Sequence, residues 1–344
     1  MDINISNMNI LSIDDNKNNL LLIEVFSQKL GLNVTSVLNP IEALQLTKKN
    51  EYDLIVVDYM MPDMNGIDFI KLFRDFNKET PIIMITASIE DINLHKEAIL
   101  SGATDFIYKP FNSVMFQARI SNLLILRKIQ NSLKEEVKKA VFTIEEREKE
   151  TLFLLAKTAE YKDPETSEHV KRVALYSKLI AKKAGLNEEE QNMIFNAAPF
   201  HDIGKVSIPD NILLKPAKLT EEEFETMKKH TIAGYDILKN SKSKYLIKGS
   251  IIALSHHEKY DGTGYPQGLK GNEIPLEGRI VAISDVFDAL TSQRPYKEPW
   301  SIEKSLNYIK ENAGKHFDPL LGNLFFNSKE EIIYIYNTIK EKGV

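Results

Sequence analysis

The stretch Leu-Ile-Val-Val-Asp, at residues 54–58, joins four apolar residues to an aspartate. Three similar runs, rich in β-branched or aromatic residues, lie at residues 10–13, 82–85 and 106–108. Short runs of this kind, bounded by turn-forming or charged residues, predict strands that are buried on both faces. Amphipathic stretches lie between them, at residues 18–30, 40–48 and 67–76. This alternation predicts a parallel sheet flanked by helices.

Polar residues directly follow each of the four runs. In chain order these are Asp14 with Asp15, then Asp58, Thr86 and Lys109. Because the carboxyl ends of parallel strands lie along one edge of an open sheet, we expect these side chains to meet. Carboxylates gathered there repel one another unless a cation joins them, and oxygen ligands with open positions suit Mg²⁺. A lysine beside such a site can neutralise a phosphoryl oxygen.

This pattern resembles the receiver domain of two-component response regulators over residues 7–125. The matching positions are Asp14-Asp15, Asp58, Thr86-Ala87, Gly102-Ala103 and Lys109-Pro110. The resemblance implies an α/β doubly wound domain with a five-stranded parallel sheet, phosphorylated on Asp58 by a cognate histidine kinase. It also implies that Asp15 and Asp58 bind Mg²⁺ directly.

The same resemblance assigns the remaining receiver residues. Met60 would lend Mg²⁺ its backbone carbonyl, and Asp14 would act on the ion through water. Thr86 would move to the phosphoryl group, and Phe106 would be the coupled aromatic switch. His95 would lie on a receiver helix, and we treat it as incidental.

Residues 126–160 contain neither glycine nor proline and are densely charged. Their apolar residues recur at steps of three and four, at Leu126, Ile129, Leu133, Val137, Ala140 and Ile144. This spacing is typical of a coiled-coil seam with one step out of strict heptad phase. Two interpretations stay open: a solvated connecting helix, or a helix that pairs with its copy in a homodimer. We favour the homodimer.

The remaining residues, 161–344, are predicted to be mainly helical. Asp163-Pro164 is typical of a helix start. Asn187 with Glu190 and Thr220 with Glu223 have capping-box spacing. Strand signals are few, so we expect an all-α domain.

Six of the seven histidines follow residue 160, and acidic residues accompany them. The candidate metal ligands are Glu165, His169, His201, Asp202, His230, His256, His257 and Asp285. Mixed imidazole and carboxylate ligands suit iron, manganese or zinc. This set is too rich for one ion, and the absence of cysteine favours a catalytic site with open positions over a structural one. Two or three metals can hold a hydroxide and neutralise a phosphodiester, which predicts metal-assisted phosphoester hydrolysis.

The ligand set resembles that of the HD-GYP phosphodiesterases over about residues 147–330. The matching motifs are Asp163-Pro-Glu-Thr, His169, His201-Asp-Ile-Gly-Lys205, His230, His256-His257, Gly264-Tyr265-Pro266, Asp285 and His316-Phe-Asp-Pro. The family hydrolyses cyclic di-GMP to pGpG, and in many members onward to GMP, so the resemblance implies this activity with iron or manganese. It also divides the ligands. His169, His201, Asp202 and Asp285 would hold one metal, and Asp202 would bridge to a second on His230, His256 and His257. Glu165 would support a third.

The family resemblance also extends to the substrate. Lys205 would be a charge beside the ligands that faces the phosphate or the leaving group, and Asp288, Arg294 and Lys297 match substrate-contacting positions. The loop of Gly264, Tyr265 and Pro266 would shape the site mouth and is a proposed contact for diguanylate cyclases. We expect His316 and Asp318 to be structural.

Composition excludes several classes of protein. With no cysteine, disulfide scaffolds, zinc ribbons and iron–sulfur proteins are excluded, and a reducing, cytoplasmic location is expected. No apolar stretch approaches 18 residues, so no membrane span is expected. The net charge of −5 and the lack of a basic recognition helix argue against DNA binding.

Two alternative functions stay open. One is hydrolysis of another cyclic dinucleotide, such as cyclic GMP–AMP, which the residues around Asp288, Arg294 and Lys297 would decide. The other is a signalling adaptor that binds without turnover, against which the full ligand set weighs.

Overall fold

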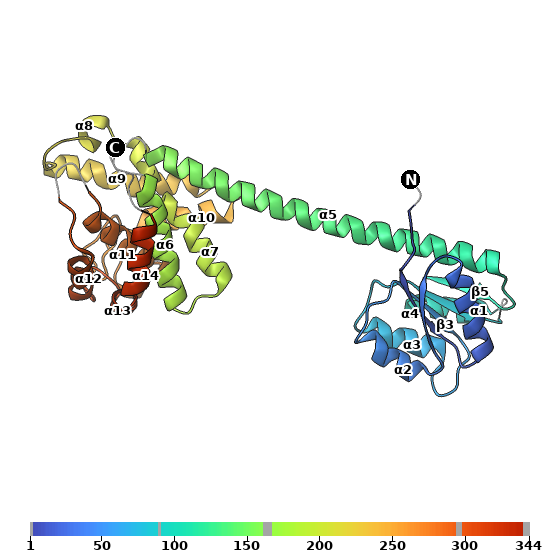
Figure 1. Ribbon diagram of the computed structural model, residues 1–344. Helices are drawn as coiled ribbons and strands as arrows, with labels where there is room; N and C mark the ends of the chain where they lie inside the picture. Colours follow the sequence, from blue (N-terminus) through green and yellow to red (C-terminus); the bar gives the residue numbers. More distant parts are fainter. Residues whose placement is uncertain (1–2, 89–90, 161–166, 294–297, 340–344) are drawn as a thin grey trace. The chain divides into compact units, whose positions relative to one another are not determined.

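The computed structural model describes residues 3–88, 91–160, 167–293 and 298–339 (Figure 1). The chain forms two compact units, Met1–Phe142 and Thr143–Val344. Their division falls inside the stretch predicted as the linker, within a single helix, α5 (Ser113–Glu160).

The first unit is a five-stranded parallel sheet, as predicted. The strands are β1 (Asn9–Ile13), β2 (Asn33–Val37), β3 (Leu54–Asp58), β4 (Ile82–Thr86) and β5 (Asp105–Tyr108), in the order β2-β1-β3-β4-β5. The helices are α1 (Lys17–Gln28), α2 (Pro40–Thr47), α3 (Gly66–Arg74), α4 (Ile92–Ser101) and the start of α5. The strand order reverses between β1 and β3, and this switch point brings the residues after both strands to one crevice.

Both faces of this sheet are buried, because successive side chains of a strand point to opposite faces. Ile55 and Val57 of β3 pack in one core with residues of α2, α3 and α4. Leu54 and Val56 pack in the other core with residues of α1 and α5. The uninterrupted apolar run that predicted the fold is therefore explained by cover on both sides.

The second unit is all helical where it is described, again as predicted. Its helices are α6 (Ser167–Lys183), α7 (Glu188–Ala197), α8 (Asp210–Leu213), α9 (Glu221–Leu238), α10 (Lys244–Ser255), α11 (Leu276–Thr291), α12 (Ile302–Glu311), α13 (Pro319–Phe326) and α14 (Lys329–Thr338). Short 3₁₀ turns form η1 (Ala198–Phe200), η2 (Ile203–Ser207) and η3 (Gly271–Glu273). Both predicted capping boxes are present, at the starts of α7 and α9.

Two cores organise this unit around α6. In the larger core, Tyr176 of α6 makes edge contacts with Phe287 of α11 and Phe325 of α13, and Ile332 brings in α14. In the smaller core, Leu152 and Ala156 of α5 pack with residues of α6, η1, α9 and α10. The last turns of α5 are therefore integral to the second unit.

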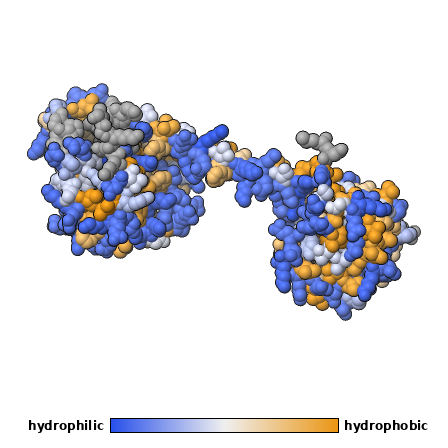
Figure 2. All heavy atoms as spheres, in the orientation of Figure 1, coloured by the Kyte–Doolittle hydropathy of each residue, from blue (hydrophilic) through white to orange (hydrophobic). Residues whose placement is uncertain are grey.

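The apolar residues in the middle of α5 are exposed to solvent. Leu126, Leu133 and Val137 of the predicted seam are each more than half exposed. Figure 2 shows the hydrophilic surface of this stretch interrupted by apolar residues. None of the described helices combines the length and the apolarity that crossing a membrane requires.

Candidate functional site

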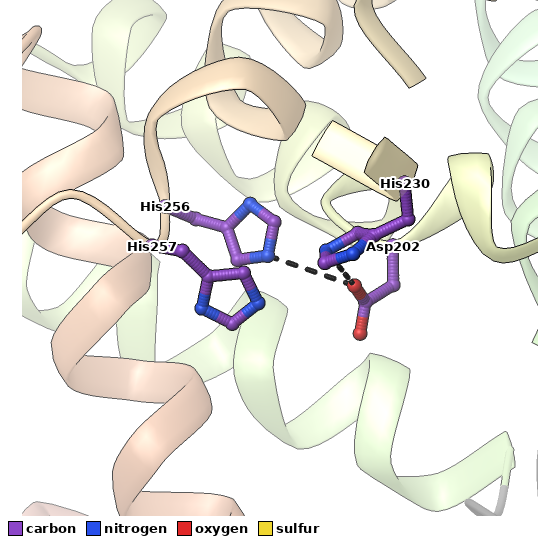
Figure 3. Close-up of side chains that lie close together, drawn as sticks. All are labelled: Asp202, His230, His256 and His257. Carbon is purple, nitrogen blue, oxygen red and sulfur yellow. Dashed lines mark ion pairs between the residues drawn. The ribbon is translucent and has the colours of Figure 1, made fainter. Parts of the chain in front are cut away.

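Seven of the eight predicted metal ligands come together in the second unit. His169 lies on α6, His201 and Asp202 lie between η1 and η2, His230 lies on α9, His256 and His257 follow α10, and Asp285 lies on α11. They form two groups, and within each group the potential ligand atoms lie within 4.8 Å of one another. One group is Asp202, His230, His256 and His257 (Figure 3), and the other is His169, His201 and Asp285. The eighth, Glu165, is outside the described residues, as are Asp163 and Pro164.

Asp202 lies between the two groups. Its Oδ1 is 3.2 Å from His230 Nε2 and 3.6 Å from His256 Nε2, as the dashed lines of Figure 3 mark. Its Oδ2 is 3.2 Å from His201 Nε2 and 2.8 Å from Lys205 Nζ. Each carboxylate oxygen thus faces a different group, which is the arrangement a bridging ligand needs.

The histidines are oriented as metal ligands are. The Nδ1–H groups of His201, His230 and His256 donate to backbone carbonyls of Ala198, Met227 and Ile252, over 2.8 to 3.1 Å. This fixes the tautomer of each neutral ring, in which the lone pair lies on Nε2. Among the described residues, these three Nε2 atoms and Asp202 Oδ1 are buried and make no hydrogen bond. Buried polar atoms without partners are rare, so this convergence fits bound metal ions.

The protonation states largely agree with metal binding. Burial favours a neutral Asp202, but Lys205 and His201 outweigh it and hold the pKa of Asp202 well below its usual range. Burial and the neighbouring His256 and His230 keep the pKa of His257 well below the ordinary histidine value. An ionised carboxylate and a neutral imidazole are the forms that bind metal. His201 differs: burial lowers its pKa, but Asp202 outweighs burial and raises the pKa to about 9.

Metal binding should therefore release a proton from His201. With a pKa of about 9, metal-free His201 is protonated at pH 7, and a metal must displace that proton. We expect Mn²⁺ affinity to rise by about tenfold per pH unit between pH 6 and 8, and to level off near pH 9. Calorimetry in two buffers of different ionisation enthalpy measures the released proton. Affinity that does not change with pH would contradict the prediction.

Asp288 needs a correction. We predicted that it contacts substrate, but its side chain has no exposed surface. Its Oδ2 accepts a 2.8 Å hydrogen bond from His169 Nδ1, and Arg172 donates to both of its oxygens. Asp288 therefore lies behind a candidate ligand, where it orients His169. The other predicted substrate contacts on this segment, Arg294 and Lys297, are outside the described residues.

The predicted loop of Gly264, Tyr265 and Pro266 lies beside the group that contains His257. The ring of Tyr265 lies 4.8 Å from that of His257, and the Tyr265 backbone N–H donates to the His257 carbonyl. A Cβ on Gly264 would lie 2.2 Å from the backbone nitrogen of Lys259, so only glycine fits there. Pro266 completes the motif. Buried Glu258 accepts from the backbone N–H of Gln267 and of Leu269, which fixes the return of the loop.

The sequence analysis did not identify Arg172, Glu258, or the contact of Phe224 with Tyr265 beside His257. Phe224, nearly half exposed, contacts Tyr265 edge-on, and Lys228 Nζ lies 5.5 and 5.8 Å from the two ring centroids. The spacing of Arg172, three residues after His169 on one helix, was a usable signal. Phe224 and Lys228 belong to no motif. Of the residues predicted as structural, Asp318 caps α13 and pairs with Arg279.

The predicted acidic pocket of the first unit also forms. Ligand atoms of Asp14, Asp15 and Asp58 lie within 4.8 Å of one another. Lys109 Nζ is 2.7 Å from Asp58 Oδ1 and 3.3 Å from Asp14 Oδ2, and buried Thr86 ends β4. Burial raises the pKa of Asp58 against the opposing effect of Lys109, and Asp14 and Asp15 add to the rise. Crowded carboxylates of this kind favour a bound cation.

Two predicted receiver residues flank this pocket differently. The Met60 side chain is exposed, whereas Phe106 is buried in β5. The His95 ring of α4 lies 5.2 Å from the Phe106 ring and 5.5 Å from that of Tyr108. His95, treated as incidental from the sequence, therefore packs against the predicted switch residue.

The chain is similar to known proteins over both units. A family model described as HD domain matches residues 154–321, and one described as response regulator receiver domain matches residues 10–121. The cyclic di-GMP phosphodiesterase response regulator RpfG of Xanthomonas campestris pv. campestris is 41% identical over 323 residues, which cover 91% of this chain and 85% of that protein. A cyclic di-GMP phosphodiesterase of Thermotoga maritima is 39% identical over 326 residues, which cover 91% and 88%.

A third relative matches only part of the chain. The 3'3'-cGAMP-specific phosphodiesterase 2 of Vibrio cholerae is 46% identical over 192 residues, which cover 56% of this chain and 37% of that protein.

Proposed function

Because the chain belongs to the response regulators with a cyclic di-GMP phosphodiesterase domain, we propose that it hydrolyses cyclic di-GMP to pGpG, GMP or both, and that phosphorylation of Asp58 controls this activity. The observation that carries the proposal is Asp202, whose two oxygens face two separate groups of buried ligands. We expect both the phosphorylation and the hydrolysis to take place in the cytoplasm.

The residues around Asp202 are suited to hold iron or manganese, with two ions in the two groups and a third if Glu165 takes part. Bound ions of this kind supply an activated water and positive charge against a phosphodiester. His169, His201 and Asp285 would hold one ion, and His230, His256 and His257 the other, with Asp202 shared. Lys205 Nζ, 2.8 Å from Asp202 Oδ2, carries a positive charge that would face the phosphate or the leaving oxygen.

The residues beside His257 would bind the rest of the substrate. The Tyr265 ring lies 4.8 Å from the His257 ring and is tilted by 33° to it. Phe224 contacts Tyr265 edge-on, and the Lys228 ammonium lies beside both aromatic rings. Stacking on an aromatic ring is a common way to bind a nucleobase. Arg294 and Lys297 remain proposed phosphate or guanine contacts, and the loop of Gly264 and Pro266 remains a proposed contact for diguanylate cyclases.

A second candidate substrate is cyclic GMP–AMP. It is favoured by the 46% identity to a 3'3'-cGAMP-specific phosphodiesterase over 192 residues. That match covers 56% of this chain, whereas the matches to the two cyclic di-GMP phosphodiesterases each cover 91%, so cyclic di-GMP is the first choice.

A turnover assay tests the proposal. Protein purified without oxygen is stripped of metal, reloaded with Mn²⁺ or Fe²⁺, and given cyclic di-GMP or 3'3'-cGAMP in parallel, with elemental analysis of each sample. We expect two or three metal ions per chain and preferred hydrolysis of cyclic di-GMP. Preferred hydrolysis of 3'3'-cGAMP would establish the second candidate. Metal-loaded protein that hydrolyses neither nucleotide would refute the enzyme and favour a signalling adaptor.

The first unit would regulate the rate of hydrolysis. Asp15 and Asp58 would bind Mg²⁺ with the Met60 carbonyl, and Asp14 would act through water. A cognate histidine kinase would phosphorylate Asp58, and Lys109 and Thr86 would bind the phosphoryl group. Phe106 would then repack, together with the His95 ring that contacts it.

The exposed seam of α5 supports a homodimer. Leu126, Leu133, Val137 and Ile144 are each more than half exposed, although leucine, valine and isoleucine favour burial. Pairing of α5 with its copy would cover them at coiled-coil spacing.

Beryllofluoride with Mg²⁺, which mimics the phosphoryl group on Asp58, is expected to change the hydrolysis rate or the dimer arrangement. The added charge alters the receiver beside α5, and a continuous helix transmits a shift better than a flexible linker. Turnover and sedimentation velocity are measured with and without the mimic. Asp58→Asn is the control and should keep basal hydrolysis without responding. If neither quantity changes in the wild type, the receiver does not regulate this enzyme.

A further inference from the structure

A buried arginine stands behind the candidate ligand His169. Arg172 lies three residues after His169 on α6, and its side chain is 2% exposed. Its Nε donates to Asp288 Oδ1 over 2.6 Å, and its Nη2 donates to Asp288 Oδ2 over 3.0 Å. Arg172 and Asp288 thus form a buried, bidentate salt bridge between α6 and α11. Nη2 also donates to Ser292 Oγ over 2.7 Å.

This pair determines how His169 presents its ring. Asp288 Oδ2 accepts from His169 Nδ1, so His169 Nε2 carries the lone pair, and Nε2 lies 3.7 Å from Asp285 Oδ1. A carboxylate that holds a ligand histidine in this way orients its ring and increases its basicity. Asp288 has no exposed surface, so it needs a fixed countercharge to remain ionised. Arg172 provides that charge in a planar, two-pronged form that lysine cannot reproduce.

The same guanidinium also reaches the residue that follows α14 (Lys329–Thr338). Arg172 Nη1 donates to the backbone carbonyl of Ile339, directly after α14, over 3.2 Å. Helix α14 is anchored by Ile332, which is fully buried in the core shared by α6 and α11. It is also anchored by the pair between Glu331 and Lys183 of α6, at 2.5 Å. One side chain therefore touches both α14 and the carboxylate behind His169.

We propose that Arg172 is a positioning residue that couples docking of the C-terminal helix α14 to metal affinity at the group of His169, His201 and Asp285. When α14 is docked, the Ile339 carbonyl and Asp288 together hold the guanidinium in place, and Asp288 holds His169. When α14 is displaced, the guanidinium loses its bond to Ile339, which weakens its hold on Asp288 and, through Asp288, on His169. The inference rests on the proposed metal centre and adds a control point remote from the receiver.

The first test uses Mn²⁺ alone, with no nucleotide. Arg172→Lys keeps the positive charge but removes the guanidinium that donates two parallel hydrogen bonds to Asp288. Arg279→Lys is the matched control, because Arg279 lies on α11, as Asp288 does, and also makes a largely buried pair, 2.6 Å from Asp318. Neither Arg279 nor Asp318 belongs to a candidate metal group. Calorimetric titration should show Mn²⁺ binding at one site weakened by about 10- to 100-fold in Arg172→Lys and unchanged in Arg279→Lys. Thermal unfolding of the metal-free proteins measures any general loss of stability.

The second test addresses α14 without changing the arginine. Ile332→Ala loosens α14, and Ile309→Ala is its control, since Ile309 of α12 is equally buried in the same core. We expect similar losses of melting temperature but several-fold weaker Mn²⁺ binding only in Ile332→Ala. This pair decides the question if Arg172→Lys does not fold.

The outcomes separate the two proposals. Wild-type Mn²⁺ affinity in Ile332→Ala or in folded Arg172→Lys would overturn the coupling, as would an equal loss of affinity in the matched controls. Failure of the wild type itself to bind Mn²⁺ would overturn the metal centre and the proposed function.

Discussion

Asp202→Ala is expected to lower hydrolysis of cyclic di-GMP by at least about a thousand-fold and to reduce the bound metal. Asp202 Oδ1 faces His230 and His256, while Oδ2 faces His201, so one truncation removes a ligand from both groups. Without this shared carboxylate, two cations would lie close together with less negative charge between them. Elemental analysis and turnover under metal excess measure the two losses.

Asp236→Ala is the matched control for this prediction. Asp236 lies on α9, as His230 does, but it is exposed and pairs with Lys239. We expect its metal content and turnover to equal those of the wild type, because exposed ion pairs contribute little. Wild-type turnover in Asp202→Ala would refute the assignment of Asp202 as the shared ligand.

Gly204→Ala is expected to destabilise the second unit by about 3 kcal/mol. A Cβ at this position would lie 1.9 Å from the backbone oxygen of His230 and 2.5 Å from the backbone nitrogen of Gly234. Both atoms belong to the backbone of α9, so no side-chain rotation relieves the clash. Helix α9 must move away from η2, and it carries His230 away from Asp202. For a unit of this size, the melting temperature should fall by about 6–12 °C.

Gly322→Ala distinguishes this clash from a general effect of added methyl groups. Gly322 lies in α13, and the nearest atoms to a Cβ there would be 3.8 Å away, which is ordinary contact. Alanine is also the better helix former, so we expect stability within about 1 kcal/mol of the wild type. If Gly204→Ala were as well tolerated, the close approach of η2 to α9 could not be what sets His230.

The sequence predicted the sheet of the first unit because its central strands are apolar on both faces. Strand β2, Asn33-Val-Thr-Ser-Val, was not identified because it lies at the sheet edge and is only partly buried. For helix α4, the sequence placed His95 on a receiver helix but gave no range. Its apolar residues Ile92, Ile99 and Leu100 are exposed, so its sequence lacks a clear buried stripe.

The candidate metal ligands could be identified because histidine and aspartate in such motifs are chemically distinctive. What surrounds them could not be, because it depends on contacts between distant residues. Arg172 and Asp288 are 116 positions apart and meet only when α6 packs on α11. Asp285 and Asp288 are three residues apart on one helix, and the family resemblance assigned the first to a metal and the second to the substrate. Only the fold turns one toward the ligand groups and the other toward Arg172.

The packing of the last turns of α5 restricts where recombination can join a different N-terminal domain to the second unit. Leu152 and Ala156 belong to the small core of the second unit, and Glu148 accepts a 2.6 Å hydrogen bond from Ser243 Oγ. A recombination event that joined a new sensor at residue 161 would remove these contacts and leave an apolar gap beside Phe200 and Tyr245. A junction nearer residue 142 would keep these contacts, because the second compact unit begins at Thr143 and includes the last turns of α5. The segment that recombination must keep intact is therefore the second unit together with the last turns of α5.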